Sequence, residues 1–176
     1  MHSGLTTNLS CLHFTMKIIR SHRRSVSTLM FLLLAFWQVA PSIQAAVVNW
    51  DAGSTVDLRW SNGSNWGGLE PTSIDDAIFP QLTPNPGSLA NPGTITLSTG
   101  EVANSLSFFN QYQLVGGDLT LTSGGVRAAL GSYSVIGSEL KGTAGLALTG
   151  GGTVRLSNAA NSYTGATTIT NGTLLI

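Results

Sequence analysis

Along residues 94–176 the chain alternates apolar and polar residues in short runs with a period of two. This period predicts β-strands with one buried face, so Ile95 and Leu97 should point inward, as should Leu106 and Phe108. Gly-rich breaks, including Gly124-Gly125, separate the runs at intervals of roughly 8–12 residues and predict turns. No window shows a sustained 3.6-residue apolar period, so little helix is expected. The pattern predicts strands at 94–98, 105–109, 112–115, 119–122, 133–136, 146–149, 153–157, 167–170 and 173–176.

The pattern is clearest in residues 148–176, where Val154 and Leu156 share one face of a predicted strand. Two further predicted strands, 167–170 and 173–176, flank the dipeptide Asn171-Gly172. Because Asn and Gly tolerate positive φ, this dipeptide predicts a sharp change of direction. It fits a two-residue hairpin. It fits equally well the corner of a solenoid coil, where the flanking strands lie on different faces, and the local pattern leaves both open.

Short motifs follow one another through this segment in a fixed order: Gly152-Thr153-Val154, Leu156-Ser157, Asn161, Tyr163-Thr164-Gly165, Thr167-Thr168-Ile169 and Gly172-Thr173-Leu174. In this order they resemble the autotransporter-associated β-strand repeat, also called the passenger-associated transport repeat, of large exported bacterial surface proteins. Ala166 departs from the family pattern, which commonly has a second Gly there. The resemblance implies a right-handed parallel β-helix in which each repeat adds about one coil.

Weak internal echoes support a repetitive fold, since residues 117–122 and 152–157 follow the same Gly-strand pattern. In a solenoid, each coil hides its apolar face only by stacking on a neighbour. A β-sandwich of short strands is the alternative that the pattern alone leaves open. Together with the resemblance, the pattern predicts an all-β fold, a right-handed parallel β-helix (solenoid) over residues 93–176.

Residues 1–45 are predicted to be a leader that contains a secretory signal peptide. A basic segment after Met16 (Lys17, Arg20, Arg23 and Arg24) precedes the apolar run 29–37, and small residues follow at 41–46. This order is typical of a signal peptide, with cleavage after Ala45 or Ala46. The run is shorter than the roughly 20 apolar residues of a spanning helix, so we expect no membrane span after cleavage. Met16 is the expected true start.

The predicted signal peptide indicates which partners the chain meets and where it is located. We expect the general secretion machinery and signal peptidase to handle the chain, and we expect a secreted or extracellular protein, or one on the outer surface of a bacterium. Because the repeat pattern runs to Ile176, we also expect the chain to be the front end of a longer solenoid.

Removal of the leader changes the available chemistry. All three His, the only Cys and all three Met lie in residues 1–45, as do four of the eight basic residues and none of the eight acidic ones. The formal net charge of the remainder therefore falls from 0 to −4. This remainder lacks the residues for Ser-His-Asp, Cys-His or His-metal sites and has no basic footprint for nucleic acid. We therefore expect no cofactor, no metal and no enzymatic activity.

Residues 46–92 are predicted to form a separate N-terminal module that ends in a Pro-rich loop at 80–92. Trp50, Trp60 and Trp66 are the module's three tryptophans. Exported proteins with these repeats often begin with a similar module, which resembles this one in its Trp-Asp opening and its Asp-Asp strand at 75–79. The large rings suit a cap over the apolar end of the first coil. As the alternative, they could form a platform on which sugar rings stack.

Acidic residues offer little further chemistry. Asp75 and Asp76, with Glu70, could be calcium ligands or a carboxylate pair. Neighbours on a strand point to opposite faces, however, so we expect a solvated strand entry instead. A polysaccharide-degrading β-helix needs a charged outer groove, whereas the charged residues of the repeat region look scattered along the sequence: Glu101, Asp118, Arg127, Glu139, Lys141 and Arg155.

The sequence therefore predicts an exported, non-enzymatic structural β-solenoid, a passenger or surface stalk of the autotransporter type. The alternative is a carbohydrate-binding or adhesin module that uses Trp50, Trp60 and Trp66 to bind surface glycans.

Overall fold

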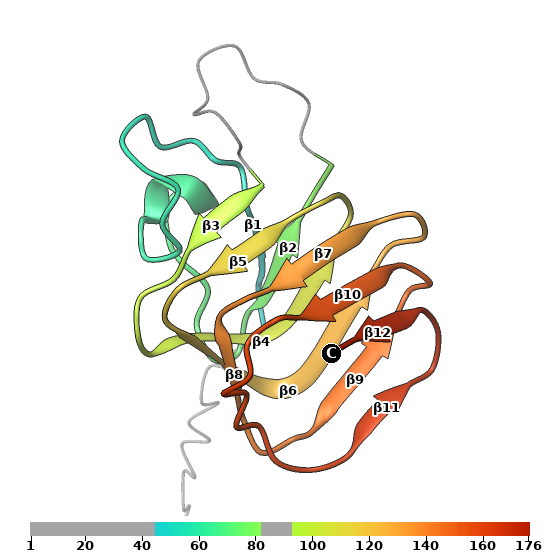
Figure 1. Ribbon diagram of the computed structural model, residues 1–176. Coiled ribbons are helices and arrows are strands. Elements are labelled where there is room, and N and C mark those ends of the chain that lie inside the picture. Colours follow the sequence, from blue (N-terminus) through green and yellow to red (C-terminus); the bar gives the residue numbers. More distant parts are fainter. Residues whose placement is uncertain (1–44, 82–92) are drawn as a thin grey trace, which may run out of the picture. The chain divides into compact units, whose positions relative to one another are not determined.

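A computed structural model describes residues 45–81 and 93–176, all of which belong to one compact unit. They form an all-β solenoid of about four turns, with parallel strands stacked from coil to coil (Figure 1). The predicted signal peptide, with Met16 and the apolar run, lies outside the described residues, as does most of the Pro-rich loop. Within the described ranges, no helix is long and apolar enough to cross a bilayer.

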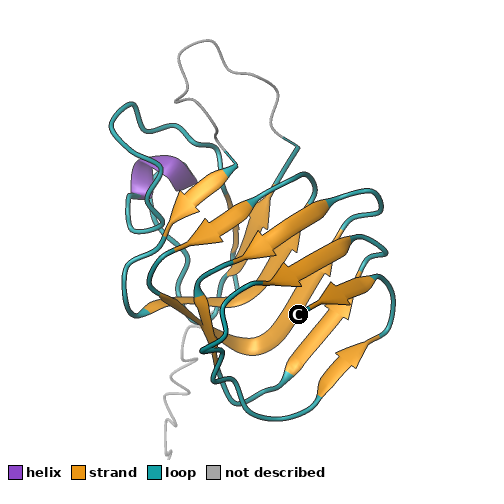
Figure 2. Cartoon of the chain, in the orientation of Figure 1, coloured by secondary structure: helices purple, strands orange, loops and turns teal. Residues whose placement is uncertain are grey.

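Two sheets form the walls of the solenoid (Figure 2). The first contains β1 (Val47–Asn49), β2 (Asp76–Phe79), β4 (Glu101–Phe108), β6 (Asp118–Ala128), β8 (Glu139–Lys141), β9 (Leu146–Thr149) and β11 (Thr167–Ile169). The second contains β3 (Thr94–Thr96), β5 (Gln113–Val115), β7 (Tyr133–Ile136), β10 (Thr153–Leu156) and β12 (Thr173–Leu175). A short 3₁₀ helix, η1 (Gly63–Trp66), precedes β2. From β2 onward the chain passes from one sheet to the other and back, which is the path of a solenoid and confirms the predicted β-helix over the β-sandwich.

The structure distinguishes between the hairpin and the coil corner that the sequence leaves open at Asn171-Gly172. β11 pairs with β9 and β12 pairs with β10, so the two flanking strands lie in different sheets. Gly172 has a φ of +110°, and a Cβ there would lie 2.7 Å from the carbonyl oxygen of Gly152 in the preceding coil. The dipeptide is therefore a coil corner that needs Gly for both backbone conformation and space, not a hairpin.

Apolar side chains stack in register through the interior. One column runs through the first sheet and the other through the second: Ala77, Leu106, Val126, Leu148 and Ile169; Ile95, Leu114, Ile136 and Leu156. All except Ile169 are buried. Because Ile136 pairs with Leu156, one coil takes up about 20 residues (136 to 156). Each fully buried Leu or Ile contributes about 1.5–3 kcal/mol, so the columns are the main source of stability.

The predicted turn at Gly124-Gly125 is wrong, because both residues lie inside the continuous strand β6. The first half of β6 pairs with β8 and the second half with β9, and Gly124, with a φ of +68°, marks the change between them. β4 shifts register at the same level, between Ala103 and Ser105. The long strands therefore bend instead of ending. Strands β1 and β8 were not predicted from the pattern.

Candidate functional site

The three tryptophans of the N-terminal module form one aromatic cluster. The Trp66 ring lies 5.0 Å from that of Trp50 and 4.8 Å from that of Trp60, between ring centroids. It also packs edge-to-face on Phe79, at 5.5 Å, and Phe79 in turn stacks on Phe108 of the next coil at 4.9 Å. The cluster thus continues the apolar interior beyond the first regular coil.

Backbone bonds place this cluster at the N-terminal edge of both sheets. β1 pairs with β2 in the first sheet. Arg59 bridges to Thr96, and the Trp60 amide donates to the Thr96 carbonyl, at the edge of the second sheet. Asn65, which is buried, joins the intervening loops, since its side chain accepts from Ser54 N at 3.1 Å and donates to the carbonyl of Arg59 at 3.0 Å. Both sheet edges are therefore covered by this module.

The structure buries all three sequence-predicted stacking residues. Trp50 and Trp60 are 0% exposed and Trp66 is 5% exposed. Sugar stacking requires an exposed ring face, and none of these rings presents one. The platform interpretation of Trp50, Trp60 and Trp66 is therefore at odds with the geometry, and packing against Phe79 is what these rings do.

Asp75 and Asp76 are occupied by hydrogen bonds and do not converge. The Asp75 carboxylate accepts from Ala46 N at 3.0 Å, from Thr72 N at 2.9 Å and from Thr72 Oγ1 at 2.5 Å. The hydrogen bond from the Thr72 hydroxyl, aided by the two backbone amides, holds the pKa of Asp75 below its ordinary value. Asp76 instead accepts from Asn104 Nδ2 and Ser105 Oγ, at 2.8 and 2.6 Å. Both carboxylates tie coils together.

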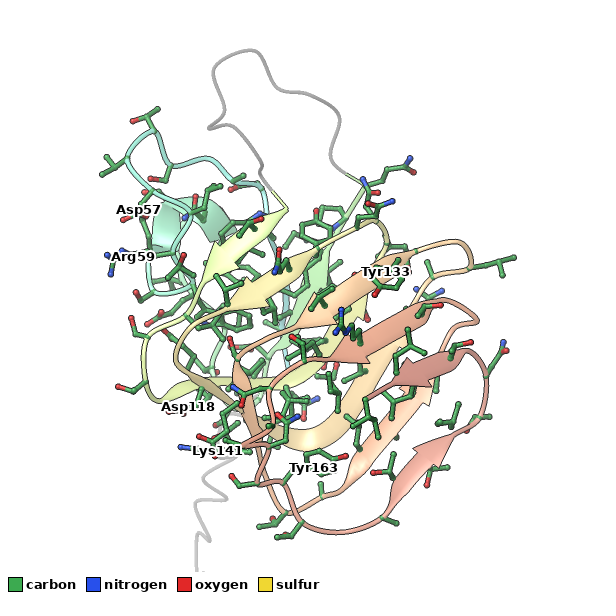
Figure 3. All side chains as sticks on the ribbon, viewed as in Figure 1. Asp57, Arg59, Asp118, Tyr133, Lys141 and Tyr163 are labelled. Atoms are coloured by element: carbon green, nitrogen blue, oxygen red, sulfur yellow. The ribbon has the colours of Figure 1, made fainter. Side chains whose placement is uncertain are left out.

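Three charged residues that look scattered in the sequence, Asp118, Glu139 and Lys141, form one cluster. Figure 3 shows Asp118 and Lys141 close together at one edge of the solenoid. Lys141 Nζ lies 3.2 Å from Asp118 Oδ2 and 3.6 Å from Glu139 Oε2. Asp118 also accepts from Gly100 N, and Glu139 from Ser162 Oγ. Register brings them together, because Asp118 pairs with Glu139 in adjacent coils. All three groups already have partners, and their ion pairs and hydrogen bonds link adjacent coils.

Burial raises the pKa of the nearby Glu101, whose carboxylate accepts from Ser98 N at 3.1 Å. The hydrogen bond to Asp118 raises the pKa of Lys141. Within the described ranges, no group of three or more His, Cys, Asp or Glu side chains could hold a metal ion.

Side chains of the terminal repeat replace strand hydrogen bonds. Asn161 Oδ1 accepts from Leu140 N at 2.8 Å, in a residue 21 positions earlier in the chain, and its Nδ2 donates to the Asn158 carbonyl at 2.7 Å. Asn158 donates back to Gly137 O at 3.0 Å. Tyr163 packs on the core, and its hydroxyl lies 3.0 Å from Thr167 Oγ1. The Asn side chains of the repeat motif thus bond back to the preceding coil, whereas the Tyr163 hydroxyl contacts Thr167 four residues later in the chain.

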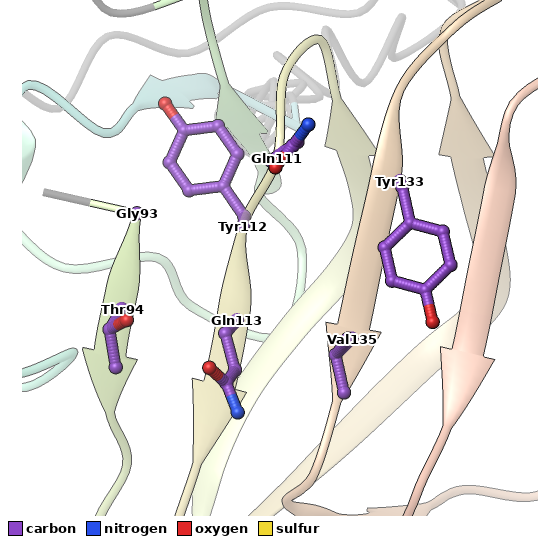
Figure 4. Close-up of a pocket in the computed structure, with 7 residues that line it drawn as sticks. All are labelled: Gly93, Thr94, Gln111, Tyr112, Gln113, Tyr133 and Val135. Atoms are coloured by element: carbon purple, nitrogen blue, oxygen red, sulfur yellow. The ribbon is translucent and has the colours of Figure 1, made fainter. Parts of the chain in front are cut away.

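An open hollow of about 400 Å³ lies on the outer face of the second sheet (Figure 4). Tyr133 lines the hollow from β7 and is 40% exposed, and Gln111 and Gln113 line it from the neighbouring coil, on the side of β7 away from the Tyr133 ring. Tyr112 also lines the hollow, but its ring is buried and its hydroxyl donates to Pro80 O at 2.5 Å. Burial raises the pKa of the Tyr112 phenol. The sequence pattern does not single out Tyr133, because its position on the outer face follows only from the register.

The comparisons with known proteins agree with the repeat. Residues 146–176 match the family model of the passenger-associated transport repeat. The chain therefore carries one such repeat, which comprises β9, β10, β11 and β12 and spans more than one full coil. No curated protein and no solved structure gave a significant match.

Proposed function

We propose that this chain is a structural protein of the autotransporter passenger type, exported to the bacterial surface, where its solenoid forms a stalk and catalyses no reaction. The observation that carries the proposal is the unbroken stack of in-register apolar columns that runs from Ala77 to Leu148 and from Ile95 to Leu156. The passenger-associated transport repeat supports the same role. A stack of this kind extends coil by coil, which suits a rod that folds after passage through a membrane.

The partners in this proposal are the general secretion machinery and signal peptidase. The basic segment, apolar run and small residues of the leader support this part of the proposal. Secretion as an unfolded chain also fits a mature chain that has no Cys and needs no disulfide formation.

Export is tested by producing the full chain with its own leader in a bacterium with two membranes. The expected product is shortened, carries β circular dichroism, and is found in the medium or digested by protease added to intact cells. The matched control is Leu33→Arg, which interrupts the apolar run and should leave the uncleaved chain in the cytoplasm. An uncleaved, cytoplasmic wild-type chain would contradict the proposal.

A second candidate function is glycan binding at the outer face of the second sheet, with surface glycans as partners. The favouring observation is the exposed Tyr133 ring in a hollow that Gln111 and Gln113 also line, since an aromatic ring and amide groups on one open surface suit an uncharged sugar. This proposal replaces the tryptophans with a residue whose ring reaches solvent.

A glycan array with the purified protein tests this second candidate. Tyr133→Ala should abolish binding, whereas Tyr133→Phe, which keeps the ring, should retain most of it. Leu130→Ala serves as a control, because Leu130 is 87% exposed and lies outside the lining of the hollow. If the wild-type chain binds no glycan, or if Tyr133→Ala binds as well as the wild type, this function is wrong.

A further inference from the structure

Two hydrogen bonds hold the backbone of Ala46 at the start of the described residues. The amide nitrogen of Ala46 donates to Asp75 Oδ1 at 3.0 Å, and the carbonyl oxygen of Ala46 accepts from the Asp76 amide at 2.8 Å. Both backbone groups of Ala46 are therefore held by the entry to β2. Ala45 and Ala46 are both exposed, so the peptide bond between them lies at the surface.

Among the described residues, the carboxylate that receives this bond has no cationic partner. Asp75 is only 8% exposed, yet its described hydrogen bonds come from neutral donors alone, namely Ala46 and Thr72. None of the ion pairs in residues 45–81 and 93–176 includes Asp75. The hydrogen bonds from Thr72 and Ala46 favour the ionised form of Asp75, and a carboxylate this buried is normally also paired with a positive charge.

We propose that the leader is removed at the Ala45–Ala46 bond and that the new α-ammonium group of Ala46 forms an ion pair with the Asp75 carboxylate. This inference rests on the proposed export and processing of the chain. Hydrolysis adds water across the peptide bond, which leaves a carboxylate on Ala45 and an amino group on Ala46. At neutral pH the amino group takes up a proton. The neutral N–H donor of Ala46 then becomes a charged one at the same place.

The geometry distinguishes between the two cleavage positions that the sequence leaves open. Cleavage after Ala46 would remove the nitrogen that contacts Asp75 and the carbonyl that accepts from Asp76. Cleavage after Ala45 keeps both contacts and strengthens the first, since an ammonium donor adds the attraction of a full positive charge to a hydrogen bond whose acceptor is already ionised. Processing would thereby fasten β1, a strand of three residues, to β2.

The test begins with the full chain, exported with its own leader, and mass spectrometry of the product. The expected first residue is Ala46. The α-amine is then selectively acetylated in a Lys141→Arg background, because Lys141 is the only lysine after residue 45. Acetylation keeps an N–H donor on Ala46 but removes its charge. We expect the melting temperature to fall by about 3–6 °C on acetylation. In the matched variant Asp75→Asn, acetylation should cause no further change.

A product that begins at Val47 or elsewhere would overturn the inference. So would an acetylation effect that is absent in the Lys141→Arg protein or unchanged when Asp75→Asn is added to it. A chain that is never exported would contradict the proposed function instead. In that case the acetylation comparison is made on residues 46–176 released from a fusion protein, since the described part of this segment is one compact unit. The presence or absence of the Asp75-dependent shift then decides the ion pair.

Discussion

At the scale of single residues, polar side chains of the repeat complete the hydrogen bonding between coils. Asn161 is the clearest case, because its amide accepts from Leu140 and donates to Asn158 where no strand supplies these partners. This gives the Asn of the repeat motif a physical role: it satisfies a backbone N–H that would otherwise lack a partner in the protein.

Asn161→Ala should lower the free energy of unfolding by about 1–3 kcal/mol, because the Leu140 amide and the Asn158 carbonyl both lose a partner. The change is measured by urea unfolding followed by circular dichroism. Asn171→Ala is the matched control, since Asn171 is exposed at a coil corner. Equal stability of the two variants would show that the Asn161 bonds contribute nothing.

The exposure of single residues also shows where the alternation of apolar and polar residues predicts the inward face correctly. Ile95, Leu97, Leu106 and Phe108 are all buried, as their spacing indicates. Ile169 follows the same alternation and pairs with Leu148, yet it is 48% exposed, because no described strand pairs with the other side of β11. Burial of an inward position thus depends on a neighbouring coil, which local alternation does not report.

At the scale of elements, the coils approach each other most closely at glycines. Gly124, inside β6, would place a Cβ 2.3 Å from the carbonyl oxygen of Gly145 in the next coil. Gly131 has a similar positive φ, +81° against +68°, but a Cβ there would meet nothing within 4 Å. The two sites separate backbone conformation from crowding.

Gly124→Ala should therefore cost about 1–3 kcal/mol more stability than Gly131→Ala. Both variants carry the strain of a left-handed backbone, so the difference measures the clash between β6 and the next coil. Thermal unfolding of the two purified variants gives the comparison. If they melt at the same temperature, the close approach at Gly145 is not a constraint on stacking.

Substitutions on the two faces of strand β10 test which face of the second sheet points inward. Leu156→Asp should cost at least about 3 kcal/mol and unfold the coils around β10, because it places a carboxylate in the apolar column. Arg155→Asp, on the exposed face of the same strand, should be nearly silent. Circular dichroism and denaturant unfolding distinguish the two. Equal tolerance would reverse the assignment of faces.

At the scale of the whole molecule, stability is shared between neighbouring coils and differs between the two ends of the stack. The aromatic cluster covers the first coil and both sheet edges there. In the last described coil, residues 167–169 are exposed, and so are Leu175 and Ile176. A repeat that has a neighbour on one side only gains fewer stacking contacts.

The protection of backbone amides from hydrogen exchange should therefore decrease from β4 and β5 toward β11 and β12. Amides of β4 and β5 should exchange only through global unfolding, whereas those of β11 and β12 should open locally at much lower free energy. Exchange of the exported protein, followed by mass spectrometry of its peptides, provides the measurement. Uniform protection across all coils would mean that the chain unfolds as one unit with no weaker end.

Local properties of the chain were enough to predict most of the strands, most of their inward faces and the repeat. Alternation marks Val154 and Leu156, and the motif around Asn161 identifies the repeat, because both depend on neighbours in sequence. Register between coils decided the rest. It brought Asp118 to Glu139 and Lys141, buried the three tryptophans against Phe79, and placed Ala46 at Asp75. Apart from Trp66 and Phe79, these contacts join residues about one coil or more apart. The spacing between coils depends on bends such as the one at Gly124, and it becomes definite only once the chain has stacked.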